Sequence, residues 1–153
     1  MRSAGLLAAA VLVTAGCGGG DADGPVIISS DGIAVLDAWV RPTPPTADEA
    51  AFYVTVENRS ASPTAVIGAS SPACMVVLPH TTTFTADGIA SMGEALDREL
   101  SLDEGERVTM EPNGLHLMCL GLAEPLATGS TVEVALELSG RDPVTVEVAV
   151  EQR

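Results

Sequence analysis

The chain has 153 residues and a formal net charge of −14, from 21 acidic residues against 7 arginines, and it contains no lysine. This charge argues against a nucleic-acid-binding surface, because phosphates require a basic one, and against electrostatic docking to anionic lipid heads. Hydrophobic residues make up 46% of the sequence and aromatic residues only 3%. The length indicates one domain preceded by a leader.

Residues 1–16 have the layout of a lipoprotein signal peptide. Arg2 precedes the short apolar run 6–13, and small residues stand directly before Cys17. The run is too short to cross a bilayer as a helix. The segment resembles a bacterial lipobox, in which the cysteine is diacylated, although Thr14 stands where leucine is usual. The alternative is an ordinary leader that is cleaved elsewhere, with Cys17 incidental.

Residues 17–32 are expected to form the acylated cysteine and a flexible tether rich in Gly and Asp. Residues 33–153 form the folded β-domain. Because two acyl chains suffice for stable anchoring, we expect an extracytoplasmic lipoprotein held at the cell membrane through Cys17.

The folded part is predicted to consist of short strands separated by turns. Alternating or apolar runs predict strands over 33–40, 50–58, 64–70, 74–80, 107–112, 115–122, 131–138 and 143–150. Three prolines make 41–47 a loop, and Asn113-Gly114 predicts a hairpin turn. Only 94–100 has a helical pattern. Many short strands at close spacing favour an all-β sandwich or barrel.

Two histidines occur, and one of them has a methionine two residues further on. On a strand, His116 and Met118 share a face, whereas Leu117 and Cys119 point the other way. Imidazole and thioether are soft, neutral ligands that suit Cu(I) and are poor for Zn, Mg or Ca. The alternative is that the methionine only fills the core and the histidine is a polar surface residue.

Two cysteines, Cys74 and Cys119, remain in the folded part. In an exported domain such a pair suggests a disulfide. Free thiols are the alternative, and a redox pair is disfavoured because no Cys-x-x-Cys is present.

From residue 33 to residue 150 the chain resembles the PCu(A)C family of periplasmic copper chaperones. The stretches that carry the resemblance are DAWVR (37–41), AAFYVTVEN (50–58), GASSPAC (68–74) and PNGLHLMCLGL (112–122). The resemblance implies a cupredoxin-like Greek-key β-sandwich or barrel. It also implies one Cu(I) per domain, bound by His80, Met92, His116 and Met118.

The spacing of these ligands departs slightly from the family pattern. The segments between His80 and Met92 and between Met92 and His116 are one and about two residues longer than usual. Met92, expected in a loop, is therefore the least certain ligand, with Met75 and Met110 as substitutes. Met110 stands where the family often has an aliphatic residue, which favours a core role.

The resemblance implies a metallochaperone rather than an enzyme. The expected recipient is the CuA centre of cytochrome c oxidase, and a Sco-type copper protein is a further expected partner. Copper storage or resistance would use the same ligands, and a metal-free interaction module is a further alternative. A serine hydrolase would need a motif that is lacking, and two histidines are too few for a usual zinc hydrolase. A blue-copper site would need Cys119 on the His116 face.

Overall fold

The computed structural model describes residues 27–29, 31–95 and 99–153 of the chain. Its strands are β1 (Ile27–Ile28), β2 (Ile33–Val40), β3 (Glu49–Asn58), β4 (Thr64–Ser70), β5 (Cys74–Phe84), β6 (Ala90–Glu94), β7 (Leu100–Leu102), β8 (Arg107–Thr109), β9 (Leu115–Leu122), β10 (Thr131–Leu138) and β11 (Val144–Val150). The leader and most of the tether lie outside the described residues. Within the described part, no helix is long and apolar enough to span a membrane.

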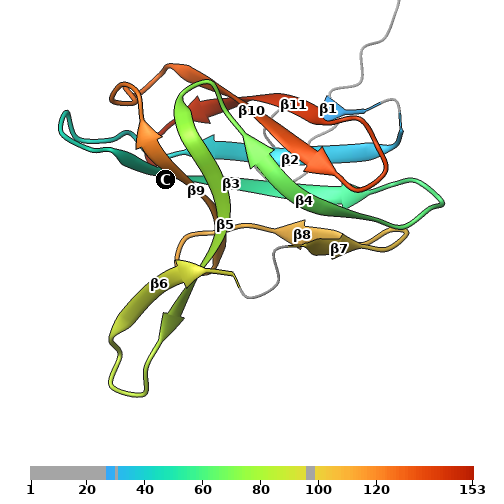
Figure 1. Ribbon diagram of the computed structural model, residues 1–153, viewed down its shortest axis with the longest axis horizontal. Coiled ribbons are helices and arrows are strands. Elements are labelled where there is room, and N and C mark those ends of the chain that lie inside the picture. The colour runs from blue at the N-terminus through green and yellow to red at the C-terminus, as the bar shows by residue number, and fades with distance from the viewer. Residues whose placement is uncertain (1–26, 30, 96–98) are drawn as a thin grey trace, which may run out of the picture.

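The strands close into a barrel (Figure 1). Neighbouring strands follow the order β2-β11-β10-β4-β5-β9-β3, and β3 pairs back with β2. Most pairs are antiparallel, while β11 and β2 run parallel. Each of the remaining strands, β1, β6, β7 and β8, pairs with one barrel strand. The predicted all-β class is confirmed.

The core follows from the alternation of apolar and polar residues. In β10, Val132, Val134, Leu136 and Leu138 are buried, and β11 repeats the pattern with Val144, Val146, Val148 and Val150. Burial of such side chains drives the two faces together at about 25 cal/mol per Å² of apolar surface. Phe52 and Leu117 lie among the fully buried side chains at the centre.

A bulge in β2 changes which residues face the core. Leu36 pairs with Thr55 and the following pair is Trp39 with Tyr53, so β2 has one residue more than β3 over this span. Asp37 takes a left-handed backbone conformation at the bulge, with φ of 49°. Odd-numbered side chains face the core before the bulge and even-numbered ones after it. Trp39 is consequently turned to the opposite face, beside Tyr53.

Four sequence predictions need correction. The hairpin expected at Asn113-Gly114 does not form in the part of the chain that the structure describes, because β8 and β9 both pair antiparallel with β3 and not with each other. The helical pattern at 94–100 is wrong where the structure describes it, since Glu94 ends β6 and Leu100 begins β7. His80 lies inside a strand rather than at its end, because β5 continues to Phe84. Met92 lies in a strand rather than a loop. In both cases the hairpin of β5 and β6 is longer than the local sequence pattern suggests.

Candidate metal centre

Strand register brings the two histidines together. His80 on β5 is the direct cross-strand partner of His116 on β9. Met118 follows on the same face, two residues further along β9. Leu117 and Cys119 belong to the hydrophobic core on the other face. The outer face of these two strands therefore carries His80, His116 and Met118, and segments far apart in the sequence supply them.

Met92 reaches the same face from the neighbouring strand. On β6 it is the cross-strand partner of Thr82, whose side chain lies on the His80 side of β5. Met92 is thus the diagonal neighbour of His80, a relation in which long side chains touch. Its side chain is 55% exposed. All four expected ligands share one face, with Met92 at the solvent side.

His116 presents a buried nitrogen suited to a metal ion. Its Nδ1 lies 3.0 Å from the carbonyl oxygen of Gly114, which can only accept, so Nδ1 carries the proton. Nε2 then has a free lone pair. It is buried without a hydrogen-bond partner in the part of the chain that the structure describes. A hydrogen bond that fixes the tautomer in this way is typical of metal-binding histidines.

The protonation of His116 is also shifted toward the metal-binding form. Burial lowers the pKa of His116, and the nearby His80 lowers it further, while donation to Gly114 acts in the opposite sense. The residue is 2% exposed. A buried neutral imidazole is the form that binds a metal ion.

The ring of His80 lies next to that of His116 across the strand pair. The two imidazole rings are 6.1 Å apart between centroids and inclined at 64°. The Nδ1 atom of His80 is likewise buried, with no hydrogen-bond partner among the described residues. Two imidazoles on one metal have comparable separations, because each nitrogen lies about 2 Å from the ion. The pair therefore fits one shared ion.

The two strands that carry the histidines are uncharged, while on the neighbouring strand β6 Glu94 is the cross-strand partner of His80. Strands β5 and β9 contain no Asp, Glu, Lys or Arg. Among the described residues, no group of three or more His, Cys, Asp or Glu could hold a metal ion. Hard divalent ions prefer anionic oxygen donors, whereas imidazole and thioether donors suit Cu(I). His80, Met92, His116 and Met118 offer imidazole and thioether donors, which are of the kind that suits Cu(I).

An aromatic row borders the site on the side of β3. The ring of Tyr53 lies 6.3 Å from that of His116, and the ring of Trp39 lies 4.5 Å from that of Tyr53. Arg41 and Arg153 sit over Trp39 at 5.8 and 5.2 Å. Burial raises the pKa of Tyr53. This row shields one flank of His116 from water, and sequence reasoning missed it because only the β2 bulge turns Trp39 to this face.

The two substitute methionines lie elsewhere. Met110 is 3% exposed and belongs to the hydrophobic core, in line with the core role expected for it. Met75 is 87% exposed and packs against Gly121, a residue with φ of 66°. Neither shares the face of His116 and Met118 as Met92 does.

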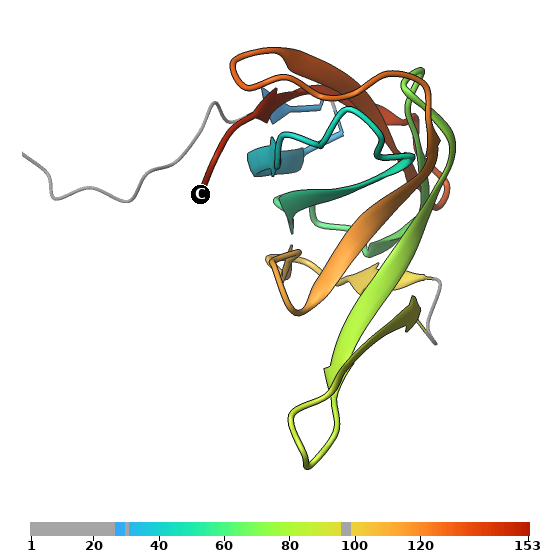
Figure 2. The ribbon, with the colours of Figure 1, turned by 90° about the vertical axis from the view of Figure 1, so that its left-hand side faces the viewer.

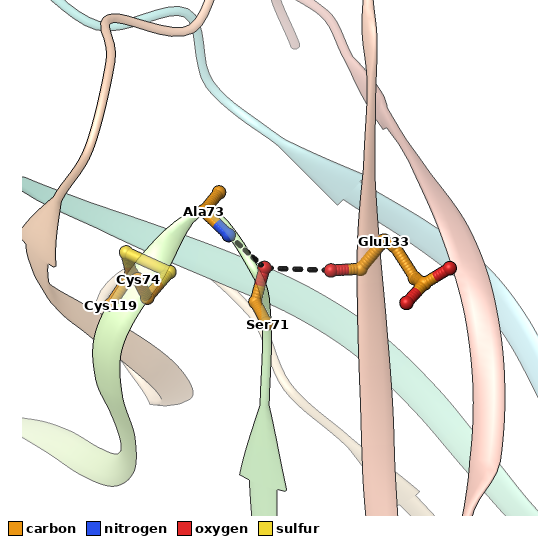
Figure 3. Close-up of a disulfide and its surroundings, with 5 residues drawn as sticks. All are labelled: Ser71, Ala73, Cys74, Cys119 and Glu133. Carbon is orange, nitrogen blue, oxygen red and sulfur yellow. Dashed lines mark hydrogen bonds between the residues drawn. A yellow bond between two sulfur atoms is a disulfide. The ribbon is translucent and has the colours of Figure 1, made fainter.

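The two cysteines of the folded part are joined by a disulfide between Cys74 and Cys119 (Figure 3). The bond links β5 to β9, the strands that supply three of the four expected ligands. Next to it, the Ser71 hydroxyl donates to the carbonyl oxygen of Glu133 at 2.7 Å and accepts from the Ala73 N–H at 3.2 Å. Cys119 lies on the core face, so a thiolate ligand of the blue-copper kind is not available. Cys17, the expected lipidation site, lies outside the described residues.

Solved structures share this fold. The apo PCuAC domain from PmoF1 is 18% identical with a TM-score of 0.66, covering 86% of this chain and 99% of that domain. The copper-bound PCuAC domain from PmoF2 is 24% identical with a TM-score of 0.65, covering 86% and 98%. The Cu(I) form of DR1885 from Deinococcus radiodurans is 27% identical with a TM-score of 0.57, covering 74% of each chain. The expected cupredoxin-like fold and resemblance to PCu(A)C domains are confirmed.

Sequence comparison gives the family. The chain is 31% identical over 121 residues to "Putative lipoprotein Lxx21020" of Leifsonia xyli subsp. xyli (strain CTCB07), covering 78% of this chain and 70% of that protein. The family model described as "Putative lipoprotein LpqE-like" matches residues 33–150, which is nearly the whole folded part. The chain therefore belongs to the LpqE-like lipoprotein family.

Proposed function

We propose that this chain is an extracytoplasmic Cu(I)-binding metallochaperone. The observation that carries the proposal is the buried Nε2 of His116, which has no hydrogen-bond partner among the described residues. The Gly114 carbonyl holds the proton on Nδ1 of this ring, and the ring of His80 lies 6.1 Å away between centroids. A buried nitrogen without a partner costs free energy unless an ion binds to it. The likeness to the Cu(I) form of DR1885 supports the same metal and oxidation state.

The four ligands in this proposal are His80, Met92, His116 and Met118. The inner three are held by strands β5 and β9, while Met92 approaches from the exposed strand β6. Neutral donors leave the charge of the ion uncompensated, which favours the monovalent over the divalent ion. We expect the bound copper to be cargo and the chain to have no catalytic activity of its own.

The recipient in this proposal is the CuA centre of a membrane-bound cytochrome c oxidase, with a Sco-type protein as a possible co-operating partner. The resemblance to PCu(A)C chaperones supports this choice. Diacylation of Cys17 would hold the domain near a membrane-bound recipient. Membership of a lipoprotein family supports this anchor.

Anaerobic titration with Cu(I) against a chromogenic chelator tests the metal site. The chain from residue 18 onward should bind one Cu(I), and the double variant His116→Ala/Met118→Ala should lose that binding. Met110→Leu is the matched control, because it removes a thioether from the core without touching the site. If the wild type does not compete with the chelator, the likeness to PCuAC domains would be one of fold only, without copper binding.

Growth under copper limitation tests delivery against storage. Deleting the gene should lower cytochrome c oxidase activity when copper is scarce, and added copper should restore that activity. A storage or resistance protein would instead leave oxidase activity unchanged and alter tolerance to excess copper.

A further inference from the structure

The hairpin of β5 and β6 projects from the barrel (Figures 1 and 2). All five residues of β6 are exposed, in contrast to the barrel strands. Three large apolar side chains of this hairpin face solvent: Phe84, Ile89 and Met92. Exposed apolar side chains gathered on one element indicate an interaction surface.

Hydrogen bonds show which way the backbone of β6 points. The Ala95 N–H donates to Pro79, and the Thr85 N–H donates to Ile89. Antiparallel pairs alternate between bonded and non-bonded types, so Ser91 and Gly93 also direct their backbone groups toward β5. The N–H and C=O groups of Ala90 and Met92 consequently point away from β5, toward the open edge.

This edge has little of the usual protection against pairing, because Glu94 is the one charged residue of β6. Within the described ranges, β5 is the only strand that pairs with β6. Its sequence, ASMGE, has no lysine and no proline, and its register with β5 contains no bulge. Edge strands without such features readily accept an additional strand.

We propose that β6 is the docking edge for an extended segment of the copper recipient. This inference rests on the proposed function, and it adds the place and the manner of docking. A strand added to β6 would form main-chain hydrogen bonds with Ala90 and Met92. Its residue opposite Met92 would project onto the same face as Met92 and His80.

That arrangement brings a second soft donor to the exposed side of the ion. A cysteine, methionine or histidine of the added strand forms a bond to Cu(I), and the bond from Met92 breaks. The copper remains Cu(I), so no electron moves, and an incoming thiol gives its proton to water. Met92 is the ligand that leaves first because it is the exposed one, while His116 and Met118 stay buried.

Charge limits the kind of partner. Residues 81–95 contain Asp87 and Glu94 but no basic residue, and the whole chain has a net charge of −14. The added segment should therefore be neutral or basic, because like charges placed opposite each other are unfavourable. A second copy of this acidic chain is disfavoured on the same ground.

A short synthetic peptide serves as the probe for this edge. In one peptide valine and threonine alternate around a central cysteine with lysine at the end, and in the other proline flanks the cysteine and prevents strand pairing. Cu(I) transfer from the loaded full chain, purified in detergent, is followed anaerobically by copper–thiolate absorbance. The strand-forming peptide should receive copper a few-fold to about tenfold faster, the effect of one or two hydrogen bonds.

Ala90→Pro removes one outward N–H and leaves the bonds to β5 and all four ligands intact. It should reduce transfer to the strand-forming peptide to the rate of the proline peptide. Ala86→Pro is the matched control, since Ala86 is the second residue of the turn closed by the Gly88 N–H and the Thr85 carbonyl. This control should transfer like the wild type, and both variants should retain wild-type Cu(I) affinity.

The outcomes of these experiments distinguish a failure of the proposed Cu(I)-binding function from a failure of the proposed docking edge. A wild-type chain that takes up no Cu(I) would overturn the proposed function and this inference together. Normal uptake with equal transfer to both peptides would overturn only the docking edge, and this comparison holds even for a misfolded Ala90→Pro. A wild type that sediments as a dimer, with a monomeric Ala90→Pro, would assign the edge to self-association and overturn docking by the recipient.

Discussion

The ring of His116 shows how a single backbone acceptor can prepare a binding atom. Gly114, two residues earlier, accepts a hydrogen bond from Nδ1 and leaves the lone pair of the buried Nε2 free to bind an ion. Asn113, with φ of 66°, lies in the tight turn that brings the Gly114 carbonyl oxygen to 3.0 Å from Nδ1 of His116. The turn at Asn113-Gly114 thus orients the His116 ring, although β8 and β9 on either side of it pair with β3 and not with each other.

The lowered pKa of His116 predicts how acid affects the metal-free protein. Its neutral form is favoured by folding, so below the unfolded pKa of 6.5 the unfolded chain binds a proton more readily than the folded one. The free energy of unfolding should therefore fall as the pH drops below 6.5, until the folded pKa is reached. Denaturant unfolding across this range measures the effect.

His116→Asn is the control for this effect, because its amide can still donate to Gly114 but does not titrate. The variant should show a flatter dependence just below pH 6.5. At lower pH, protonation of carboxylates lowers the free energy of unfolding further. Glu57 is one of them, because hydrogen bonds from Arg59 and Arg107 lower its pKa in the folded protein. An identical dependence in both proteins would show that His116 makes no contribution.

Asn58 is a second residue with a position-specific role, here in stability. Its buried side chain donates from Nδ2 to the carbonyls of Ser62 and Leu102, both at 2.9 Å. Its Oδ1 accepts from the N–H of Ser60 at 3.0 Å and from the Ser60 hydroxyl at 2.7 Å. One amide therefore joins the end of β3 to the following loop and to β7.

Asn58→Ala should lower the free energy of unfolding by about 2–4 kcal/mol, because it leaves buried groups without partners. Urea denaturation measures this change. Ser60→Ala should cost less, since the Asn58 amide still donates to both carbonyls. Equal losses in the two variants would contradict a central role for Asn58. Cu(I) affinity should be unchanged in both.

At the level of elements, strands β5 and β9 form the unit that makes the site. They are paired from Cys74 to Thr81 along β5, and the disulfide fixes them covalently. One face of this pair carries His80, His116 and Met118, while the other carries Val77, Leu117 and Cys119 into the core. Packing of the inner face thereby fixes the positions of the ligands on the outer face.

Removing the disulfide should destabilise the fold more than it weakens the site. The two cysteines are 45 residues apart in sequence, and closing a loop of this size contributes about 2–4 kcal/mol. Cys74→Ala/Cys119→Ala should lose about this much in guanidinium unfolding. Reduced wild type should behave similarly. A stability equal to that of the oxidised wild type would refute this account.

The copper site of the same variant provides a separate measurement. Hydrogen bonding between β5 and β9 still holds His80 opposite His116, so the Cu(I) affinity should change by less than about tenfold, the effect of 1.4 kcal/mol. A larger loss would mean that the disulfide itself positions the ligands.

For the whole molecule, most acidic side chains are exposed, and one of them, Glu94, lies on the strand next to His80. Acidic side chains cover the exterior, whereas the strands β5 and β9 are uncharged. An acidic exterior raises the local concentration of cations and keeps the domain soluble. Selection of the metal is then left to the soft donors of the site.

The anchor is a property of the whole chain that can be tested directly. Cys17→Ala removes the acylated residue and should release the protein from the membrane fraction into the medium or periplasm, because no acyl chains remain to hold it. Immunoblotting of the fractions measures this. Retention of Cys17→Ala in the membrane would argue against the lipid anchor. Purified Cys17→Ala should bind Cu(I) like the wild type, since none of the four proposed ligands is changed.

Local patterns in the sequence determined most strands of this protein. Residues 33–40, 64–70, 115–122 and 131–138 were predicted with the bounds that the structure has, because alternation and turn residues act within a few positions. The same period of two predicted that His116 and Met118 share a face. These features depend only on residues that are close to one another in the sequence.

Only the tertiary structure decided which strands lie together. The pairing of β5 with β9 places His80 opposite His116, and the long β5–β6 hairpin turns the expected loop around Met92 into a strand. The bulge at Asp37 turns Trp39 onto Tyr53, which lies beside His116. Register between distant strands is set by how the whole core packs, and no local propensity encodes it.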